Sequence, residues 1–200
     1  RDKLVTGVQT CALPIYITDV PLVARVAVHG RQAVRVRLGF GDDRPAVLAT
    51  FGGHGGNIPL HEAAADGSFL VVATDYEVPP WMPAHSNLRI VTARELEREG
   101  LTYTDLLTAC DVVATKLGYG IVSECVANQV PLLYTTRGRF VEQDVFIREM
   151  PPFLRCRAIT REALRAGAWA DDVHALLSQP AATQALRADG AETIARMLVG

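Results

Sequence analysis

Short apolar runs alternate along this chain with longer segments whose apolar residues recur at the spacing of an α-helix. The runs are typical of strands buried on both faces, and the segments between them are typical of helices that cover a sheet. Such alternation indicates a parallel sheet with right-handed crossovers. The predicted strands are 46–51, 69–73, 88–91, 111–115, 131–134 and 154–159. We therefore expect an α/β fold, with helices on both faces of a parallel sheet.

The predicted helices carry start and stop signals. Thr102 or Thr104 can cap a helix at 102–110, because a threonine hydroxyl accepts a hydrogen bond from a free N–H of the first turn. Pro151 and Pro152 end a helix at 141–150. The other predicted helices are 120–128, a short one at 31–38, and two or three within 161–199. Each strand is thus followed by a loop at its carboxyl end, where ligands of such sheets bind.

The first residues are not expected to belong to this fold. Residues 5–15 read VTGVQTCALPI, which looks like the translation of a sequencing adapter, so residues 1–15 are treated as an artefact. Residues 16–44 are predicted to be a linker from a missing N-terminal domain. Residues 45–200 are predicted to be one folded domain, which fits the usual size range.

Composition narrows the choice of function. Hydrophobic residues make up 49% of the chain, and the net charge is only −2 without a basic face or tail. That balance argues against nucleic acid or an anionic membrane as the main partner. No apolar run approaches the ~20 residues that span a bilayer, so membrane association is at most peripheral. The spacing of Cys11, Cys110, Cys125 and Cys156 fits no metal site, and we expect reduced thiols in a cytoplasmic protein.

Residues 115–124 are the strongest candidate for a binding site. They lie where a strand ends and a helix begins, and there the free N–H groups and the helix dipole attract an anion. Gly118 and Gly120 let the backbone approach a phosphate, and Lys116 adds a positive charge. Glu124, one turn into the helix, can accept hydrogen bonds from two ribose hydroxyls. The alternative is a tight strand-to-helix turn whose polar residues only cap the helix.

A second glycine-rich loop follows the first predicted strand. Gly52, Gly53 and Gly55 surround His54, which can hydrogen-bond a phosphate or act as a base. The alternative is a flexible loop with a surface histidine. Because the carboxyl ends of parallel strands meet at one edge of the sheet, we expect both glycine loops to face the same ligand.

A third polar stretch, residues 137–144, follows the fifth predicted strand. Arg137 can contact a phosphate, and Glu142 and Gln143 can hold sugar hydroxyls. The alternative is a solvated loop whose acidic residues interact with the dipole of the next helix. The chain has neither a P-loop lysine–serine pair nor G-x-G-x-x-G, which disfavours an ATP site of that kind and a nicotinamide-binding domain.

Residues 118–131 read GYGIVSECVANQVP, and this string resembles the donor-binding signature of GT-B glycosyltransferases. It is similar to plant-type UDP-sugar transferases and to peptidoglycan N-acetylglucosaminyltransferases. The likeness is strongest to the glycosyltransferase-like region of L-arabinokinases and its stand-alone bacterial relatives. Residues 51–56 resemble the first glycine loop of the same domain. The resemblance covers residues 16–200 and implies a Rossmann-like sheet that forms the C-terminal half of a GT-B fold.

The resemblance also implies residue roles. Lys116 stands where the plant enzymes have a histidine that contacts the diphosphate, and Glu124 matches the glutamate that holds the ribose. Gln129 replaces a glycine, which suggests a different bend before the fifth strand. Glu142 and Gln143 fall about two positions from a sugar-contacting pair. The expected donor-binding residues are Gly52, Gly53, His54, Gly55, Lys116, Gly118, Tyr119, Gly120, Ser123, Glu124, Arg137, Glu142 and Gln143.

We therefore expect a fragment of a hexosyltransferase-like glycosyltransferase that binds a UDP-sugar and transfers the sugar to an unknown acceptor, without a metal or other cofactor. Lys116 and the helix dipole would stabilise the departing diphosphate. The general base is expected in the missing N-terminal domain, with His54 the candidate in this chain. One alternative is a sugar-nucleotide epimerase of the same architecture, which would need further acidic and histidine groups in the cleft. Another is a non-catalytic module that senses sugar nucleotides.

Overall fold

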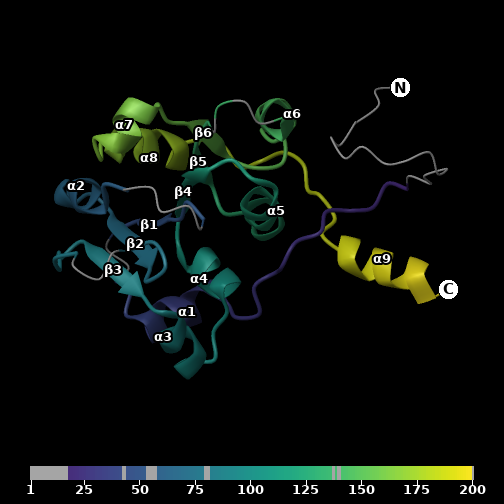
Figure 1. Ribbon diagram of the computed structural model, residues 1–200, viewed down its shortest axis with the longest axis horizontal. Coiled ribbons are helices and arrows are strands. Elements are labelled where there is room, and N and C mark those ends of the chain that lie inside the picture. The colour runs from purple at the N-terminus through teal and green to yellow at the C-terminus, as the bar shows by residue number, and fades with distance from the viewer. Residues whose placement is uncertain are drawn as a thin grey trace.

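The computed structural model describes residues 18–41, 44–52, 58–78, 82–136, 138 and 141–199. In these residues, six strands form one fully parallel sheet in the order β3-β2-β1-β4-β5-β6. Helices pack on both faces of the sheet (Figure 1). The strands are β1 (Ala46–Ala49), β2 (Leu70–Thr74), β3 (Leu88–Val91), β4 (Val112–Lys116), β5 (Leu132–Thr135) and β6 (Cys156–Ala158). The expected α/β class and Rossmann-like sheet are confirmed.

The helices agree with the predicted ones except for two short additions. The short helix expected at 31–38 is present, and the C-terminal part of the chain forms three helices. Helices at 60–65 and 93–98 were not expected. The helices are α1 (Arg31–Leu38), α2 (Leu60–Ala65), α3 (Ala93–Arg98), α4 (Tyr103–Ala109), α5 (Tyr119–Asn128), α6 (Val141–Glu149), α7 (Arg161–Arg165), α8 (Ala170–Leu177) and α9 (Gly190–Val199).

The core has two halves, one on each face of the sheet, because neighbouring strand residues point in opposite directions. In β1, Leu48 faces the helices α1, α3, α4 and α5, whereas Val47 faces α2 and α8. Trp169, fully buried before α8, fills the second half. All four residues of β1 are buried, which explains why its apolar run is uninterrupted.

The strand order reverses between β1 and β4. The chain moves from β1 outward to β2 and β3, and then from β4 outward to β5 and β6 on the other side. The connections after β1 and β4 therefore leave the sheet in opposite directions and open a crevice at the carboxyl ends of these two strands. Gly52, the last described residue after β1, lies at this switch point together with Lys116 and Gly118.

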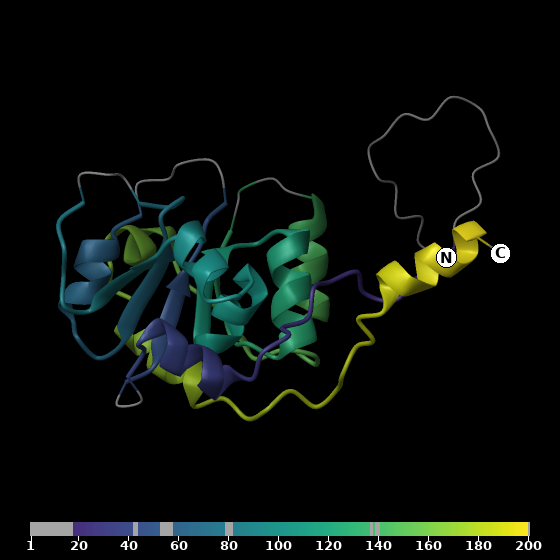
Figure 2. The ribbon, with the colours of Figure 1, turned by 90° about the horizontal axis from the view of Figure 1, so that it is seen from below.

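Part of the predicted linker is integrated into the domain. Val34 and Leu38 of α1 are buried in the core beside α4. Residues 18–30, which we call the N-terminal segment, run across the surface toward α1 (Figure 2).

Asp105, whose side chain is fully buried, accepts hydrogen bonds from the backbone N–H groups of Val28 and His29 at 2.9 and 2.8 Å. It also completes a capping box with Thr102, which is the N-cap of α4 and one of the two threonines predicted for that position.

The two ends of the described chain lie side by side. Leu22 exchanges backbone hydrogen bonds with Arg187 and Gly190 at 3.0 and 3.1 Å, and Val23 forms an antiparallel bridge with Asp189. Beyond this contact α9 stands clear of the sheet in both views (Figures 1 and 2). No helix in the described ranges has both the length and the apolar character needed to cross a membrane.

Gln129 corrects one expectation. It is the C-cap of α5 and adopts the left-handed conformation, φ 55° and ψ 36°, that glycine favours. The helix therefore ends with a bend of the type glycine makes, and the different bend suggested by the substitution is wrong. The Gln129 side chain donates to the carbonyls of Val126 at 2.8 Å and Phe153 at 3.1 Å, which offsets part of the conformational cost.

We expect Gln129→Ala to lower the free energy of unfolding by about 1 kcal/mol, because it removes both hydrogen bonds and keeps the strain. Gln129→Gly also loses the bonds but relieves the strain, so its stability should stay near that of the wild type. Urea unfolding of the three proteins measures the difference. Equal stabilities of the alanine and glycine variants would contradict the left-handed conformation.

Asp105 is expected to make stability pH-dependent. Burial raises its pKa, but hydrogen bonds from Thr102 and from the backbone of His29 and Thr102 outweigh burial, and the pKa lies below its ordinary value of 3.8. The stabilisation is therefore complete above pH 3.8 and is lost as the pH falls through the lowered pKa.

Asp105→Asn should accordingly cost about 2 kcal/mol of unfolding free energy at pH 7. The cost should shrink at pH values near the lowered pKa, where the wild-type carboxylate is itself protonated. Thermal unfolding across this range is the measurement. Asp172→Asn, which removes a surface partner of Arg157, is the control and should change little. A cost that is the same at every pH would contradict the role given to the charge.

Candidate functional site

A cavity of about 400 Å³ lies at the switch point of the sheet. Its walls come from the carboxyl ends of β1 and β4, the starts of α4 and α5, and the N-terminal segment. We call it the switch-point cavity. The residues that line it are Arg25, Thr50, Phe51, Gly52, Tyr103, Thr115, Lys116, Gly118, Tyr119, Gly120, Ile121 and Glu124. Five of the predicted donor-binding residues after β4 thus face one space, together with Gly52 from the loop after β1.

One end of the cavity is suited to an anion. Gly118 is the N-cap of α5, with an extended backbone and no side chain that caps the helix. The N–H groups of the first turn have no partner within the helix, and no acidic residue lies in that turn. A Cβ added to Gly120 would meet nothing within 4 Å, so the space beside this residue is open. Lys116, the last residue of β4, lines the same end and adds positive charge.

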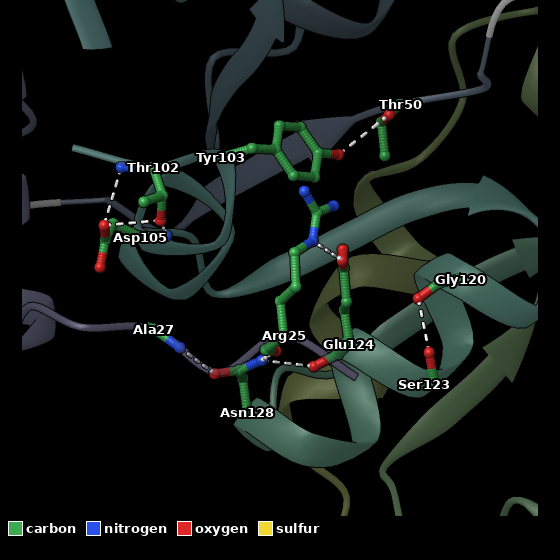
Figure 3. A network of polar contacts seen from close by, with 10 residues as sticks. All are labelled: Arg25, Ala27, Thr50, Thr102, Tyr103, Asp105, Gly120, Ser123, Glu124 and Asn128. Carbon is green, nitrogen blue, oxygen red and sulfur yellow. Dashed lines mark hydrogen bonds and ion pairs between the residues drawn. The ribbon is translucent and has the colours of Figure 1, made fainter. Parts of the chain in front are cut away.

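The other end of the cavity holds a carboxylate already paired with an arginine. Glu124 comes from α5, and its side chain is only 8% exposed. Its Oε1 accepts a hydrogen bond from Nε of Arg25 at 2.5 Å (Figure 3). The Arg25 guanidinium lies 5.9 Å from the centre of the Tyr103 ring. The predicted ribose carboxylate therefore faces the cavity, but one of its oxygens is engaged by a side chain from the N-terminal segment.

Asn128 fixes the backbone that carries Arg25. Its Oδ1 accepts from the N–H of Ala27, and its Nδ2 donates to the carbonyl of Arg25, both at 2.9 Å. Nδ2 also donates to the carbonyl of Glu124 at 2.8 Å, one turn earlier in α5 (Figure 3). One side chain thus ties the N-terminal segment to the helix that presents Glu124. Tyr119 adds a further contact, since its hydroxyl accepts from the N–H of Val23 at 3.2 Å.

A chain of hydrogen bonds connects the floor of the cavity to the loop after β1. The Tyr103 hydroxyl donates to Thr50 Oγ1 at 3.1 Å, and Thr50 donates to Glu77 Oε1 at 3.3 Å. The same oxygen of Glu77 accepts from the N–H groups of Phe51 at 2.9 Å and Gly52 at 3.0 Å. Burial raises the pKa of Tyr103, which keeps its hydroxyl protonated as a donor. The N–H groups of Phe51 and Gly52, at the start of the first glycine loop, therefore bind the Glu77 carboxylate. The N–H groups that face the cavity and can bind an anion are those at the start of α5.

Several predicted residues lie elsewhere. Ser123 is buried, and its hydroxyl donates to the Gly120 carbonyl at 2.9 Å within the helix. Glu142 and Gln143 start α6 and line neither the switch-point cavity nor the other described cavities. Gln143 is buried and approaches the Gly138 carbonyl at 3.5 Å. The predicted residues Gly53, His54, Gly55 and Arg137 lie outside the described residues, so their roles stay predictions.

The sequence did not single out three residues of the cavity, Arg25, Thr50 and Tyr103, or the hydrogen bonds by which Glu77 supports it. Thr50 follows a predicted strand and Tyr103 starts a predicted helix, so topology alone could have placed them at the carboxyl edge. Glu77 follows the second strand, and nothing in its neighbourhood indicates its contact. Arg25 lies in a segment without local pattern and is brought to Glu124 only by tertiary structure.

The described residues offer little for metal or thiol chemistry. They contain no group of three or more histidine, cysteine, aspartate or glutamate side chains placed to hold a metal ion. Cys110 and Cys125 are buried and unpaired. Burial raises the pKa of Cys110 to about 12, so its thiol stays protonated at neutral pH.

Comparison with known proteins gives both a sequence relative and structural relatives, although no family model matches the chain. The chain is 30% identical to L-arabinokinase of Arabidopsis thaliana over 166 residues, which are 80% of this chain and 15% of that protein. The structure matches spinosyn forosaminyltransferase SpnP with a TM-score of 0.51 at 18% identity, over 93% of this chain and 47% of SpnP. It matches the glycosyltransferase VinC, solved in complex with dTDP, with a TM-score of 0.52 at 22% identity, over 80% and 38% of the two chains.

These matches confirm the expected GT-B type of fold and the expected sequence similarity to L-arabinokinase. The chain spans less than half the length of either glycosyltransferase, 47% and 38%, and only 15% of L-arabinokinase. The described residues of this chain contain a six-stranded parallel sheet and the switch-point cavity. The chain therefore has the fold of one half of a GT-B glycosyltransferase, and its sequence is similar to a segment of L-arabinokinase.

Proposed function

We propose that the switch-point cavity binds the pyrophosphate and ribose of a nucleotide diphosphate sugar, and that this chain is the donor-binding half of a glycosyltransferase. The observation that carries the proposal is the placement of Lys116, the N-terminus of α5 and Glu124 around one open space. A cation with free amides suits a diphosphate, and a carboxylate one turn away suits vicinal hydroxyls. The solved complex of VinC with dTDP supports a nucleotide diphosphate as the ligand class.

The groups at the phosphate-binding end of the cavity would also assist the transfer of the sugar. In glycosyl transfer, the bond between the anomeric carbon and the phosphate oxygen breaks as a bond to the acceptor oxygen forms, and the acceptor proton passes to a base. Negative charge accumulates on the leaving diphosphate. The α5 dipole and Lys116 are fixed where that charge would develop, so they would stabilise the transition state without reorganising. None of the described residues that line the cavity is a histidine, so the general base would be His54 or a residue outside the described part of the protein.

Ribose binding must accommodate Arg25. A carboxylate offers about four lone-pair sites on its two oxygens, and Arg25 uses Oε1 of Glu124. The ribose hydroxyls would bind Oε2 and compete with Arg25 for Oε1. The Arg25 side chain is 68% exposed and can move into solvent, whereas Glu124 is 8% exposed and would then take the ribose hydroxyls as its partners.

We propose uracil as the nucleobase of the donor, since the signature at 118–131 resembles that of UDP-sugar transferases. A non-catalytic module that binds the same donor is the second candidate, because the sequence relative carries the name of a kinase and not of a glycosyltransferase. Both candidates bind the nucleotide-sugar donor, but only the enzyme transfers the sugar to an acceptor. Transfer of a sugar by the full-length protein, with release of UDP, would decide for the enzyme.

Titration calorimetry with UDP and dTDP tests the site. Lys116→Ala and Glu124→Ala should each weaken UDP binding about tenfold, because each removes one charge-assisted contact. Lys116→Arg keeps the charge and should lose less. Glu97→Ala changes an exposed glutamate of α3 and is the matched control for Glu124. If both alanine variants bind UDP and dTDP as the wild type does, the site is wrong.

Arg25→Ala should strengthen the binding of uridine, which presents the ribose without phosphate, roughly two- to fivefold. The reason is that the variant removes the group that competes for Glu124. The gain should vanish when Glu124→Ala is already present, as a double-mutant cycle by NMR titration would show. A gain that persists without Glu124, or a loss in its presence, would mean that Arg25 does not compete with the ribose.

A further inference from the structure

A second cavity of about 310 Å³ adjoins the switch-point cavity at the carboxyl ends of β4 and β5. We call it the basic cavity. It shares Phe51 and Lys116 with the switch-point cavity, so it begins where the diphosphate would end. The described residues that line it are Phe51, Lys116, Thr135, Thr136, Arg161, Leu164 and Arg165. Under the proposed function, this is the space next to the phosphate that carries the sugar.

Its charge is positive. Arg161 and Arg165 lie four residues apart in α7 and therefore on one face of that helix. Arg161 donates to the carbonyl of Thr136 at 3.2 Å, which holds its guanidinium over the end of β5. Neither arginine forms an ion pair with an acidic side chain in the part of the chain that the structure describes, and no described lining residue is acidic.

Thr135 gives a second, independent indication of a ligand. It ends β5, lines the basic cavity and is only 6% exposed. Its hydroxyl is buried and has no hydrogen-bond partner among the described residues. A buried hydroxyl without a partner costs free energy, so folded proteins seldom leave one. An oxygen of a bound molecule would supply the missing partner.

The chemistry of these groups selects the kind of sugar. An arginine has five donors and no acceptor, and its planar fork matches the two oxygens of a carboxylate. A neutral hexose presents hydroxyls that also need acceptors, and the predicted acceptors Glu142 and Gln143 do not line this cavity. We propose that the basic cavity binds a carboxylate-bearing glycosyl group, so that the donor is a nucleotide diphosphate uronic acid. This inference rests on the proposed function, because the nucleotide places the sugar.

The experiment compares the binding of UDP, UDP-glucuronate and UDP-glucose to the same chain by titration calorimetry. If dTDP binds more tightly than UDP, the corresponding dTDP-sugars are compared. UDP-glucuronate should bind about tenfold more tightly than UDP-glucose, the size of one charge-assisted hydrogen-bonded pair. Because both arginines are exposed, the preference should fall as salt is raised.

Variants of the residues that line the basic cavity test which side chains cause the preference for UDP-glucuronate. Arg161→Gln and Arg165→Gln should each remove most of the preference, because each should lower the affinity for UDP-glucuronate more than the affinity for UDP or UDP-glucose. Thr135→Val should reduce the preference without lowering the melting temperature, since it removes an unpaired buried hydroxyl. Arg94→Gln, an exposed arginine of α3, is the matched control and should retain the preference.

The outcomes separate the two proposals. Equal affinity for UDP-glucose and UDP-glucuronate, with UDP bound, would overturn the uronic acid and leave the proposed function standing. A preference that survives both arginine variants would also overturn it. Absence of binding to UDP and to dTDP would overturn the proposed function and this inference together.

Discussion

The arrangement of the whole site depends on the reversal of strand order between β1 and β4. Because the chain leaves these neighbouring strands in opposite directions, the described residues leave a crevice at their carboxyl ends, and the N-terminus of α5 faces it. The sheet beneath is rigid, since β1 and most of β4 are completely buried. Lys116 and Gly118 belong to the end of β4 and the start of α5, so the positive end of the crevice is held by the core itself.

The N-terminal segment adds the second element of the site. Asp105 and Asn128 hold its backbone through four hydrogen bonds, and Arg25 reaches from it to Glu124. A segment that runs outside the sheet thereby contributes a side chain to the cavity. Two charged contacts lie within and beside the cavity, Arg25 on Glu124 and Glu77 on the N–H groups of Phe51 and Gly52. Ligand binding would exchange the first of these contacts and keep the second.

The sequence predicted the fold well because burial on both faces leaves an unmistakable apolar run in each central strand. It also predicted the strand-to-helix turn that carries Lys116, Gly118 and Glu124, since that turn is local. The six-residue helices α2 and α3 were missed because fewer than two turns do not display a helical period. Arg25 and the arginines of the basic cavity were missed for another reason. They meet their neighbours only through contacts between segments far apart in the chain, and no local pattern records such contacts.

The most direct test of the central claim is an NMR titration of the labelled chain with UDP, followed through the backbone amide signals. We expect the largest shifts at Gly118, Gly120 and Ile121, at the start of α5, with smaller shifts around Glu124. Residues Ile58, His61 and Glu62, which line a cavity beside α2 that shares no residue with the switch-point cavity, should not respond. Shifts centred on that cavity, or no saturable shift at the start of α5, would contradict the account.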